Sequence, residues 1–158
     1  MAIKIRDADE RDIPSLAELS RFAQDLHVAA LPDHFKQPES DAASEWMRAK
    51  LRREDARTWV ACLGHAVVGY VVVAIRERQE NALCRARRAH EIEEIVVSPA
   101  HRRQGVARAL VDRVLEDARL RGIRDVELTS WSFNVDAHRA FEALGFRPML
   151  VRFGRESE

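Results

Sequence analysis

One stretch, residues 91–110, constrains the fold more than any other part of the chain. Its apolar residues are typical of a strand as far as Val97, and Ser98-Pro99 then breaks that strand. A basic loop follows, and a helix begins near Gly105. The first backbone N–H groups of a helix have no internal partner, and the helix dipole adds positive charge there. The stretch therefore predicts a strand–loop–helix unit that can bind an anion.

The loop itself favours a phosphate as that anion. Arg102 and Arg103 place two permanent cations beside the free N–H groups. Gly105 has no Cβ to keep a bulky anion away, and Ala107 is nearly as small. The Gly-Lys-Ser/Thr of a P-loop and the G-x-G-x-x-G of a dinucleotide site are both missing. On spacing alone, a phosphate site and a merely basic loop both remain open.

Two motifs in this half of the chain resemble those of a known family. Residues 102–107 (RRQGVA) resemble the R/Q-x-x-G-x-G/A motif of the GNAT superfamily of N-acetyltransferases, and residues 97–99 are similar to the strand end that precedes it there. Residues 134–137 and 141–146 resemble that family's N-x-x-A…(Y/F)-E-x-L-G-F signature. The two motifs have the family's order and roughly its spacing. The resemblance covers nearly the whole chain and is strongest over residues 91–146.

The order of the expected elements gives the fold class. We expect strands over residues 3–5, 58–63, 66–75, 90–97, 125–130 and 146–153. We expect a first helix capped by Asp12, a second over residues 40–53 with Trp46 buried, a third from Gly105 to Gly122 and a fourth that starts near Asn134. This alternation predicts an α/β or α+β mixed sheet with helices on both faces. The resemblance implies a GNAT-like, mostly antiparallel central sheet in a single domain of residues 1–158. Its parallel strands, residues 91–97 and 125–130, would splay apart.

The resemblance implies that acetyl-CoA binds in the gap between those strands. Backbone N–H groups of residues 103–107 would hold the pyrophosphate, and the strand backbone of residues 95–97 would bond the pantetheine arm and polarise the thioester carbonyl. Asn134 matches a position that often bonds the CoA arm, although a helix cap explains this residue equally well. No metal is expected. The implied cofactor-binding residues are Ile95, Val96, Val97, Arg102, Arg103, Gln104, Gly105, Val106, Ala107, Arg108 and Asn134.

The strand over residues 90–97 carries three carboxylates. Simple alternation puts Glu91 and Glu93 on one face and Glu94 on the other. A carboxylate inside a central strand is costly unless it is paired, hydrogen-bonded or beside a wet cleft. Pairing with nearby arginines is one explanation. The other is a general base, since burial and like-charge crowding raise the pKa of a carboxylate.

A base is useful because an amine attacks only in its neutral form. An amine of pKa about 10.4 is roughly 0.04% neutral at pH 7. The resemblance favours Glu93 as the catalytic base, followed by Glu91 and Glu94, and the base can act through water.

One residue departs from the family's pattern. Phe141 stands where many similar proteins carry Tyr, which is often proposed to protonate the leaving thiolate. Phe cannot donate a proton, and the only tyrosine is Tyr70, on a different strand. A thiolate of pKa about 8.5 is a tolerable leaving group, so we expect slower transfer rather than none. Plain core packing of Phe141 is equally consistent.

The acceptor contacts come from the segment between the first two helices, which the resemblance implies lines the acceptor pocket. His27, His34 and Phe35 are the candidates, and His27 and Phe35 are the predicted substrate-binding residues. In the alternative reading the histidines are exposed and Phe35 covers the core.

Composition excludes several classes of protein. The 158 residues have a formal net charge of zero, so no strong attraction to nucleic acid or to an anionic membrane follows. No apolar run reaches the length of about 18 residues that a membrane helix needs, and the N-terminus lacks the core of a signal peptide. Cys62 and Cys84 show neither disulfide nor metal spacing. These features indicate a cytoplasmic protein.

The sequence therefore predicts an acetyl-CoA-dependent N-acetyltransferase that moves an acetyl group directly to a primary amine of a small molecule. One alternative is an acyl-CoA-binding sensor or partner-binding module with weak or no catalysis. Phe141 favours this alternative, and the carboxylate-rich strand opposes it. Another is an acetyltransferase acting on protein lysine or N-terminal amines. The expected partners are acetyl-CoA and an amine acceptor, with no nucleic acid and no membrane, and a homodimer is possible.

Overall fold

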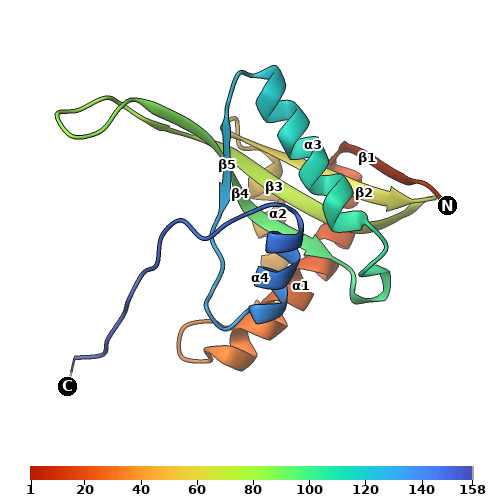
Figure 1. The fold of residues 1–158 in the computed structure, drawn as a ribbon. Coiled ribbons are helices and arrows are strands. Elements are labelled where there is room, and N and C mark those ends of the chain that lie inside the picture. The colour runs from red at the N-terminus through yellow and green to blue at the C-terminus, as the bar shows by residue number, and fades with distance from the viewer. Residues whose placement is uncertain (158) are drawn as a thin grey trace.

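The computed structural model describes residues 1–157 (Figure 1). Short 3-10 turns, Glu10–Asp12 and Pro99–His101, precede the first and third helices. The elements in chain order are β1 (Ile3–Asp7), α1 (Ile13–Ala30), α2 (Ala42–Leu51), β2 (Ala56–Leu63), β3 (Ala66–Arg78), β4 (Arg87–Val97), α3 (Val106–Leu120), β5 (Asp125–Leu128) and α4 (Val135–Ala143).

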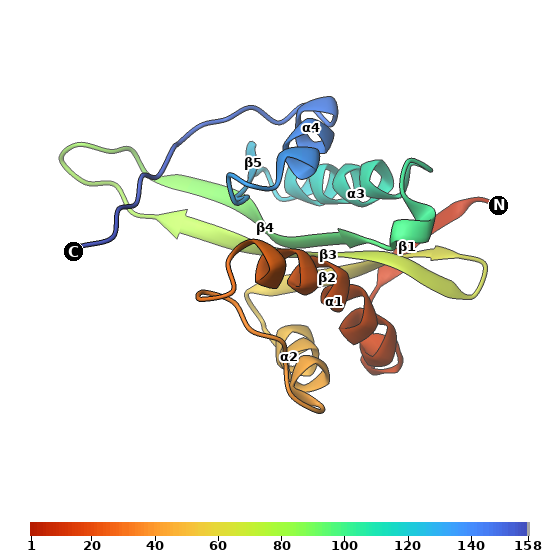
Figure 2. The same ribbon diagram turned by 90° about the horizontal axis from the view of Figure 1, so that it is seen from below.

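The strands form one mixed sheet in the order β1-β2-β3-β4-β5. The first three pairings are antiparallel, and β4 pairs with β5 in parallel. Helices α1 and α2 cover one face of the sheet, and α3 and α4 cover the other (Figure 2). The predicted mixed sheet with helices on both faces is confirmed.

Helix α3 lies on the sheet through an apolar stripe at helical spacing. Its residues Val106, Leu110 and Val114 are buried in one core cluster with strand residues of β2, β3 and β4. Glycine at position 69 of β3 permits this close approach. A Cβ there would lie 2.9 Å from the Val96 carbonyl oxygen and 3.1 Å from a methyl carbon of Val106. The start of α3 is thereby held against β3 and β4.

The opposite face has a second core cluster, in which α1 and α2 pack against β2 and β3. Met47 supplies the buried side chain of α2 and is 2% exposed. The prediction that Trp46 is buried was wrong, since it is 62% exposed and its ring lies beside the Lys50 ammonium group, 5.3 Å from it. One helical residue turns a side chain by about 100°, so an error of one position moves it from core to surface.

Asp12 stands at the start of α1 but does not cap it. Its side chain makes no capping bond to α1. Instead its carboxylate accepts two hydrogen bonds of 2.8 Å from Arg6 and one of 2.9 Å from the Asp9 N–H. The Arg6 guanidinium lowers the pKa of Asp12. The residue predicted as a cap is therefore the buried half of a partly exposed ion pair with Arg6, which fixes the turn before α1.

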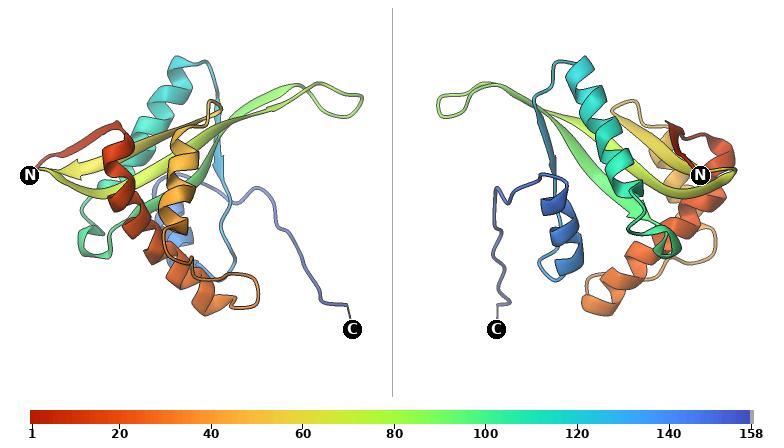
Figure 3. Two further views of the ribbon diagram at one scale, coloured as in Figure 1. Left: turned by 180° about the vertical axis from the view of Figure 1, so that it is seen from behind. Right: turned by 45° about the vertical axis from the view of Figure 1, so that its right-hand side comes forward.

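Two segments extend from the body of the fold (Figures 1 and 3). The β3–β4 hairpin is longer than predicted, because β3 continues to Arg78 and β4 already begins at Arg87. The strand predicted over residues 146–153 is wrong, since these residues have no regular structure. Their apolar side chains Met149, Leu150, Val151 and Phe153 are 67–92% exposed.

Replacing Gly69 tests how closely α3 packs on the sheet. Gly69→Ala should lower the free energy of unfolding by about 1–3 kcal/mol, because the new Cβ must displace the Val96 carbonyl. Urea denaturation measures this change. Gly154→Ala is the control, since a Cβ there meets nothing within 4 Å, and it should change stability by less than about 0.5 kcal/mol. Equal stability of the two variants would contradict the close packing.

Candidate active site

The two parallel strands, β4 and β5, are the last two of the sheet, and they separate partway along their length. β5 pairs with β4 only from Ala89 to Ile92. β5 ends at Leu128, whereas β4 continues to Val97. Within residues 1–157, no strand pairs with residues 93–97 of β4 on their β5 side. The predicted splay is confirmed, and it leaves backbone polar groups of β4 open to a ligand.

A β-bulge lies in β4 at the point of separation. Val72 of β3 lies opposite Glu94, and the next residue, Val73, lies opposite Ile92. Glu93 is therefore the additional residue on the β4 side of the pairing. A bulge breaks the strict alternation of side chains. The contacts of each side chain, rather than its position in β4, therefore show on which face of the sheet it lies.

The contacts place all three carboxylates on the α2 side of the sheet. Arg76 donates to Glu91 at 3.0 Å and to Glu93 at 2.9 Å. The Lys50 ammonium group of α2 lies 3.9 Å from Glu93 and 3.0 Å from Glu94. The prediction that Glu94 faces away from the other two was wrong, because alternation alone cannot include a bulge.

Glu93 is the most strongly paired of the three. Arg53 donates to its two oxygens at 2.6 and 3.0 Å, and Arg76 adds a bond of 2.9 Å. The hydrogen bonds from Arg53 lower the pKa of Glu93, against the opposing effect of burial. Arginine pairing, one of the two explanations from sequence, is thus present, whereas the raised pKa expected of a general base is not found at Glu93. The carboxylate is anionic at neutral pH.

Glu94 is linked to the only tyrosine of the chain. The Tyr70 hydroxyl donates to Glu94 at 3.0 Å, and Tyr70 itself is 1% exposed. Burial, followed by the charge of Glu94, raises the pKa of Tyr70 far above its ordinary value. Tyr70 therefore stays protonated and acts here as a hydrogen-bond donor.

A cluster of aromatic rings joins the end of α1 to the loop after β5. His27 stacks on Phe35 with ring centroids 4.8 Å apart, and its edge meets Phe133 at 6.0 Å. Trp131 contacts both His34 at 5.1 Å and Phe35 at 5.5 Å. Burial lowers the pKa of His27, while the charge of Glu94 opposes this shift. His27 thus joins the end of α1 to the loop after β5, and its ring is influenced by the charge of Glu94.

The loop before α3, residues 102–105, has the backbone shape of an anion site and is called the anion loop below. Arg103 and Gly105 have positive φ angles of 60° and 85°. The first main-chain hydrogen bond of α3 runs from the Ala109 N–H to the Gly105 carbonyl, at 3.0 Å. Among residues 1–157, no main-chain carbonyl accepts from the N–H groups of residues 102–108. Arg102, Arg103 and Gln104 are exposed, so donors and cations are available together.

Two predicted cofactor contacts have partners within the chain. The Arg108 guanidinium donates to the Ala143 carbonyl at the end of α4, at 3.3 Å. The side-chain oxygen of Asn134 accepts from the Ala137 N–H at 3.3 Å, so the helix-cap reading of Asn134 has its geometry. Phe141 packs edge-on against Phe146, with ring centroids 6.2 Å apart. The Arg108 bond links the end of α4 to α3, and the Asn134 bond caps the start of α4.

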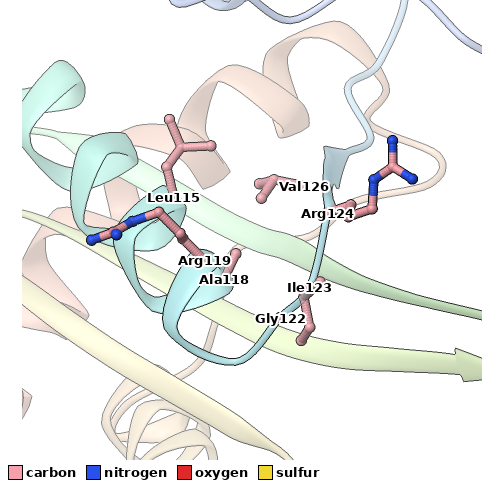
Figure 4. Close-up of a pocket in the computed structure, with 7 residues that line it drawn as sticks. All are labelled: Leu115, Ala118, Arg119, Gly122, Ile123, Arg124 and Val126. Atoms are coloured by element: carbon pink, nitrogen blue, oxygen red, sulfur yellow. The ribbon is translucent and has the colours of Figure 1, made fainter.

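A separate hollow of about 420 Å³ lies between the C-terminal half of α3 and β5 (Figure 4). It is far along α3 from the anion loop, and it contains none of the residues described above. We do not assign it to the active site. Its lining residues are Leu115, Ala118, Arg119, Gly122, Ile123, Arg124 and Val126.

No helix within residues 1–157 has both the length and the apolar character needed to cross a bilayer. The same residues contain no group of three or more His, Cys, Asp or Glu side chains that could hold a metal ion.

The splayed strands and the anion loop at the start of α3 together define an acetyltransferase-type fold. Residues 20–146 match the model of the acetyltransferase (GNAT) family. This range is more than half of the chain, and the chain belongs to that family. Acetyl-CoA is the family's acetyl donor, and the open N–H groups of the loop suit its phosphates.

Several proteins are similar to this chain. N-acetylaspartate synthetase from Rattus norvegicus is 38% identical over 91 residues, which are 58% of this chain and 28% of that protein. The chain thus spans less than a third of that relative. A tetramutant of the BH1408 protein from Bacillus halodurans has a TM-score of 0.92 at 20% identity, covering 98% of this chain and 99% of that one. AAC(6')-Iy, solved with the bisubstrate analog CoA-S-monomethyl-acetylneamine, has a TM-score of 0.73 at 22% identity, covering 99% of both chains.

Sequence reasoning allowed for pairing with arginines but did not identify which cations surround the carboxylates. Lys50 and Arg53 come from the end of α2 and the turn after it, and Arg76 comes from β3. All three are distant from β4 in the sequence, and the chain has 26 lysines and arginines, so no local pattern selects them. Tyr70 carried one signal, because a buried tyrosine hydroxyl needs a partner.

Changing Gly105 tests the anion loop. Gly105→Ala should weaken acetyl-CoA binding about tenfold, because a side chain at φ 85° strains the turn that aims the N–H groups. Isothermal titration calorimetry measures the Kd. Gly122→Ala is the control, with a φ of 66° at the other end of α3 and nothing within 4 Å of its Cβ. It should carry similar strain without changing the Kd, and equal effects would contradict this loop as the binding site.

Proposed function

We propose that this chain transfers an acetyl group from acetyl-CoA to a primary amine of a small molecule. The observation that carries the proposal is the coincidence of three features along β4. The strand loses its β5 partner after Ile92, it bulges at Glu93, and it leads directly to the anion loop before α3. Acetyl-CoA supplies an activated thioester, and such a strand offers both a channel and polar groups for it.

The cofactor contacts are assigned by chemistry. The N–H groups of residues 103–107, with Arg102, Arg103 and Gln104, bind the pyrophosphate through charge-assisted bonds. The backbone of Ile95, Val96 and Val97 bonds the pantetheine arm, because its β5 side has no strand partner among the described residues. Val106, Ala107 and Arg108 contribute their N–H groups at the first turn of α3, and Asn134 adds its side-chain amide from the start of α4.

Glu93 and Glu91 are assigned to the proton transfer. Glu93 is the residue at the bulge, and its lowered pKa keeps it anionic at neutral pH. An anion attracts the ammonium form of the acceptor and orients it. Because two arginines already bind Glu93, it is better suited to receive the proton through a water molecule than directly. Glu91 shares Arg76 with it and is the second candidate.

His27 and Phe35 are assigned to acceptor binding. Their rings stack beside the gap, and the loop after β5 closes the same cluster from the other side. Aromatic faces attract ammonium groups, which supports an amine acceptor.

The main alternative is an acyl-CoA-binding sensor with little or no catalysis. One observation favours it: Phe141 packs on Phe146 and cannot protonate the leaving thiolate. Transfer to protein lysines or N-terminal amines is a second alternative with the same chemistry and a different acceptor.

An amine panel separates these functions. Release of free CoA thiol from acetyl-CoA should rise at least tenfold above the hydrolysis background with one class among polyamines, amino acids and aminoglycosides, since acceptor binding supplies the orientation for transfer. A spectrophotometric thiol assay measures it, and calorimetry measures acetyl-CoA binding in parallel. Turnover on peptides alone would select the protein-acceptor alternative. Tight binding without turnover on any amine would select the sensor.

Replacing Glu93 tests its catalytic role. Glu93→Gln should lower kcat about 100-fold while leaving the acetyl-CoA Kd unchanged, because the proton acceptor is lost while the loop that binds the cofactor is unaltered. Steady-state kinetics with the amine found above measures this. Glu127→Gln is the matched control, since Arg87 holds the Glu127 carboxylate of β5 with two bonds of 2.9 and 3.0 Å outside the bulge. Unchanged kcat in Glu93→Gln would move the role to Glu91 or Glu94.

A further inference from the structure

Lys50 is the only lysine within residues 1–157 that pairs with the carboxylates of β4, and the proposed mechanism gives it no role. Its ammonium nitrogen lies 3.0 Å from an oxygen of Glu94 and 3.9 Å from one of Glu93. The Lys50 side chain is only 11% exposed. Met47, three residues earlier on α2, is buried in the core and holds this part of the helix against the sheet (Figure 2). Lys50 is therefore held beside the carboxylates.

The chain has few amines of its own that an acetyl group could modify. Of its 26 lysines and arginines, only Lys4, Lys36 and Lys50 are lysines. The other cations around the carboxylates, Arg53 and Arg76, are guanidinium groups, which stay protonated and do not attack a thioester. Lys4 and Lys36 are exposed. Among the described residues, Lys50 is thus the only side-chain amine that the fold brings to the carboxylates.

The position of Lys50 suits an acceptor amine. A general base must lie within hydrogen-bond reach of the amine that it deprotonates, and Glu94 is at that distance from Lys50. If the pantetheine arm follows the open edge of residues 95–97 away from the anion loop, its thioester end reaches the bulge at Glu93. Glu94 lies between the bulge and that edge. The Lys50 amine and the thioester would therefore meet at the same part of β4.

We propose that Lys50 is a self-acetylation site, an inference that rests on the proposed acetyl transfer. The Lys50 ammonium group gives one proton to Glu94, and the neutral amine attacks the carbonyl carbon of acetyl-CoA. A C–N bond forms and the C–S bond breaks. The second proton of the amine goes to the leaving thiolate, and Glu94 passes the first one to solvent. The products are the Nε-acetyl amide of Lys50 and the CoA thiol, and no further reactant is consumed.

Acetylation of Lys50 changes the charge of the site. An acetylated lysine has no positive charge and cannot form an ion pair. Glu93 keeps its two arginines, whereas Glu94 keeps only the hydrogen bond from the Tyr70 hydroxyl among the described residues. The Glu94 side chain is 28% exposed, so an ammonium group can reach it from solvent. Self-acetylation thus removes the cation that competes with an amine acceptor for Glu94.

Incubation with acetyl-CoA alone, followed by peptide mapping with mass spectrometry, tests the site. Lys50 should be acetylated at least about tenfold faster than Lys4 and Lys36, because proximity to the base and the thioester outweighs its burial. Uncatalysed acetylation favours exposed lysines, so Lys4 and Lys36 are internal controls. Acetylation of the exposed lysines only, or of no lysine, would overturn the proposal.

A pair of conservative variants checks the assignment by intact mass. Lys50→Arg keeps the positive charge and should abolish the rapid gain of one acetyl group per chain. Lys36→Arg is the matched control and should gain the acetyl group at the parent rate. Circular dichroism checks that both variants are folded. A rapid gain that persists in Lys50→Arg would overturn the proposal.

The dependence on protein concentration shows whether the reaction occurs within one chain. Because Lys50 is nearly covered where it pairs with Glu94, a second copy cannot take it into its own site. The first-order rate constant should therefore stay the same over an about tenfold range of protein concentration, as expected of an intramolecular reaction. A rate constant that rises in proportion to the concentration would indicate transfer between copies and overturn the proposal.

The amine panel separates this inference from the function on which it rests. Turnover of an external amine with Lys50 left unmodified would overturn self-acetylation alone. Tight acetyl-CoA binding with neither turnover nor modification would overturn self-acetylation and the proposed transfer together. Modified Lys50 without turnover of any amine in the panel would support self-acetylation and would leave the external acceptor as the failed part of the proposed function.

Discussion

The separation of β4 from β5 is the constraint on which the rest of the structure depends. β4 must be hydrogen-bonded to β3 along its length, and yet it must be free on its other side after Ile92. Backbone polar groups without partners are costly in a sheet that is buried on both faces. The fold therefore needs a ligand or water along that edge. An extended ligand arm that carries amide groups can form the hydrogen bonds that a neighbouring strand would form with this edge. The gap is therefore where the site lies.

The bulge at Glu93 converts this backbone opening into an electrostatic feature. It brings three carboxylates to one face, where Lys50, Arg53 and Arg76 surround them. Carboxylates this close would repel one another without cations. The end of α2 is accordingly fixed by charge as well as by Met47 in the core. The position of the helix that covers the site and the ionisation of the site thus have the same cause.

Sequence patterns predicted much of what depends on local chemistry. Helical spacing predicted the stripe of α3, and the helix begins directly after Gly105, which has a positive φ. Two errors arise where a shift of one residue changes the face on which a side chain lies. Trp46 and Met47 exchange core and surface, and the bulge changes the face of Glu94. A bulge depends on the partner strand, so the alternation within β4 could not reveal it.

The failure of the predicted strand over residues 146–153 has a different origin, and it leads back to the gap. The pattern was strand-like, but a strand exists only when a neighbour completes its hydrogen bonds. β5 has only four residues paired with β4, because a longer pairing would close the gap. It therefore gains little support from the inner side of the sheet, although the loop after it holds Trp131 and Phe133 against His27 and Phe35. These aromatic contacts therefore help to position the end of β5 where its pairing with β4 stops.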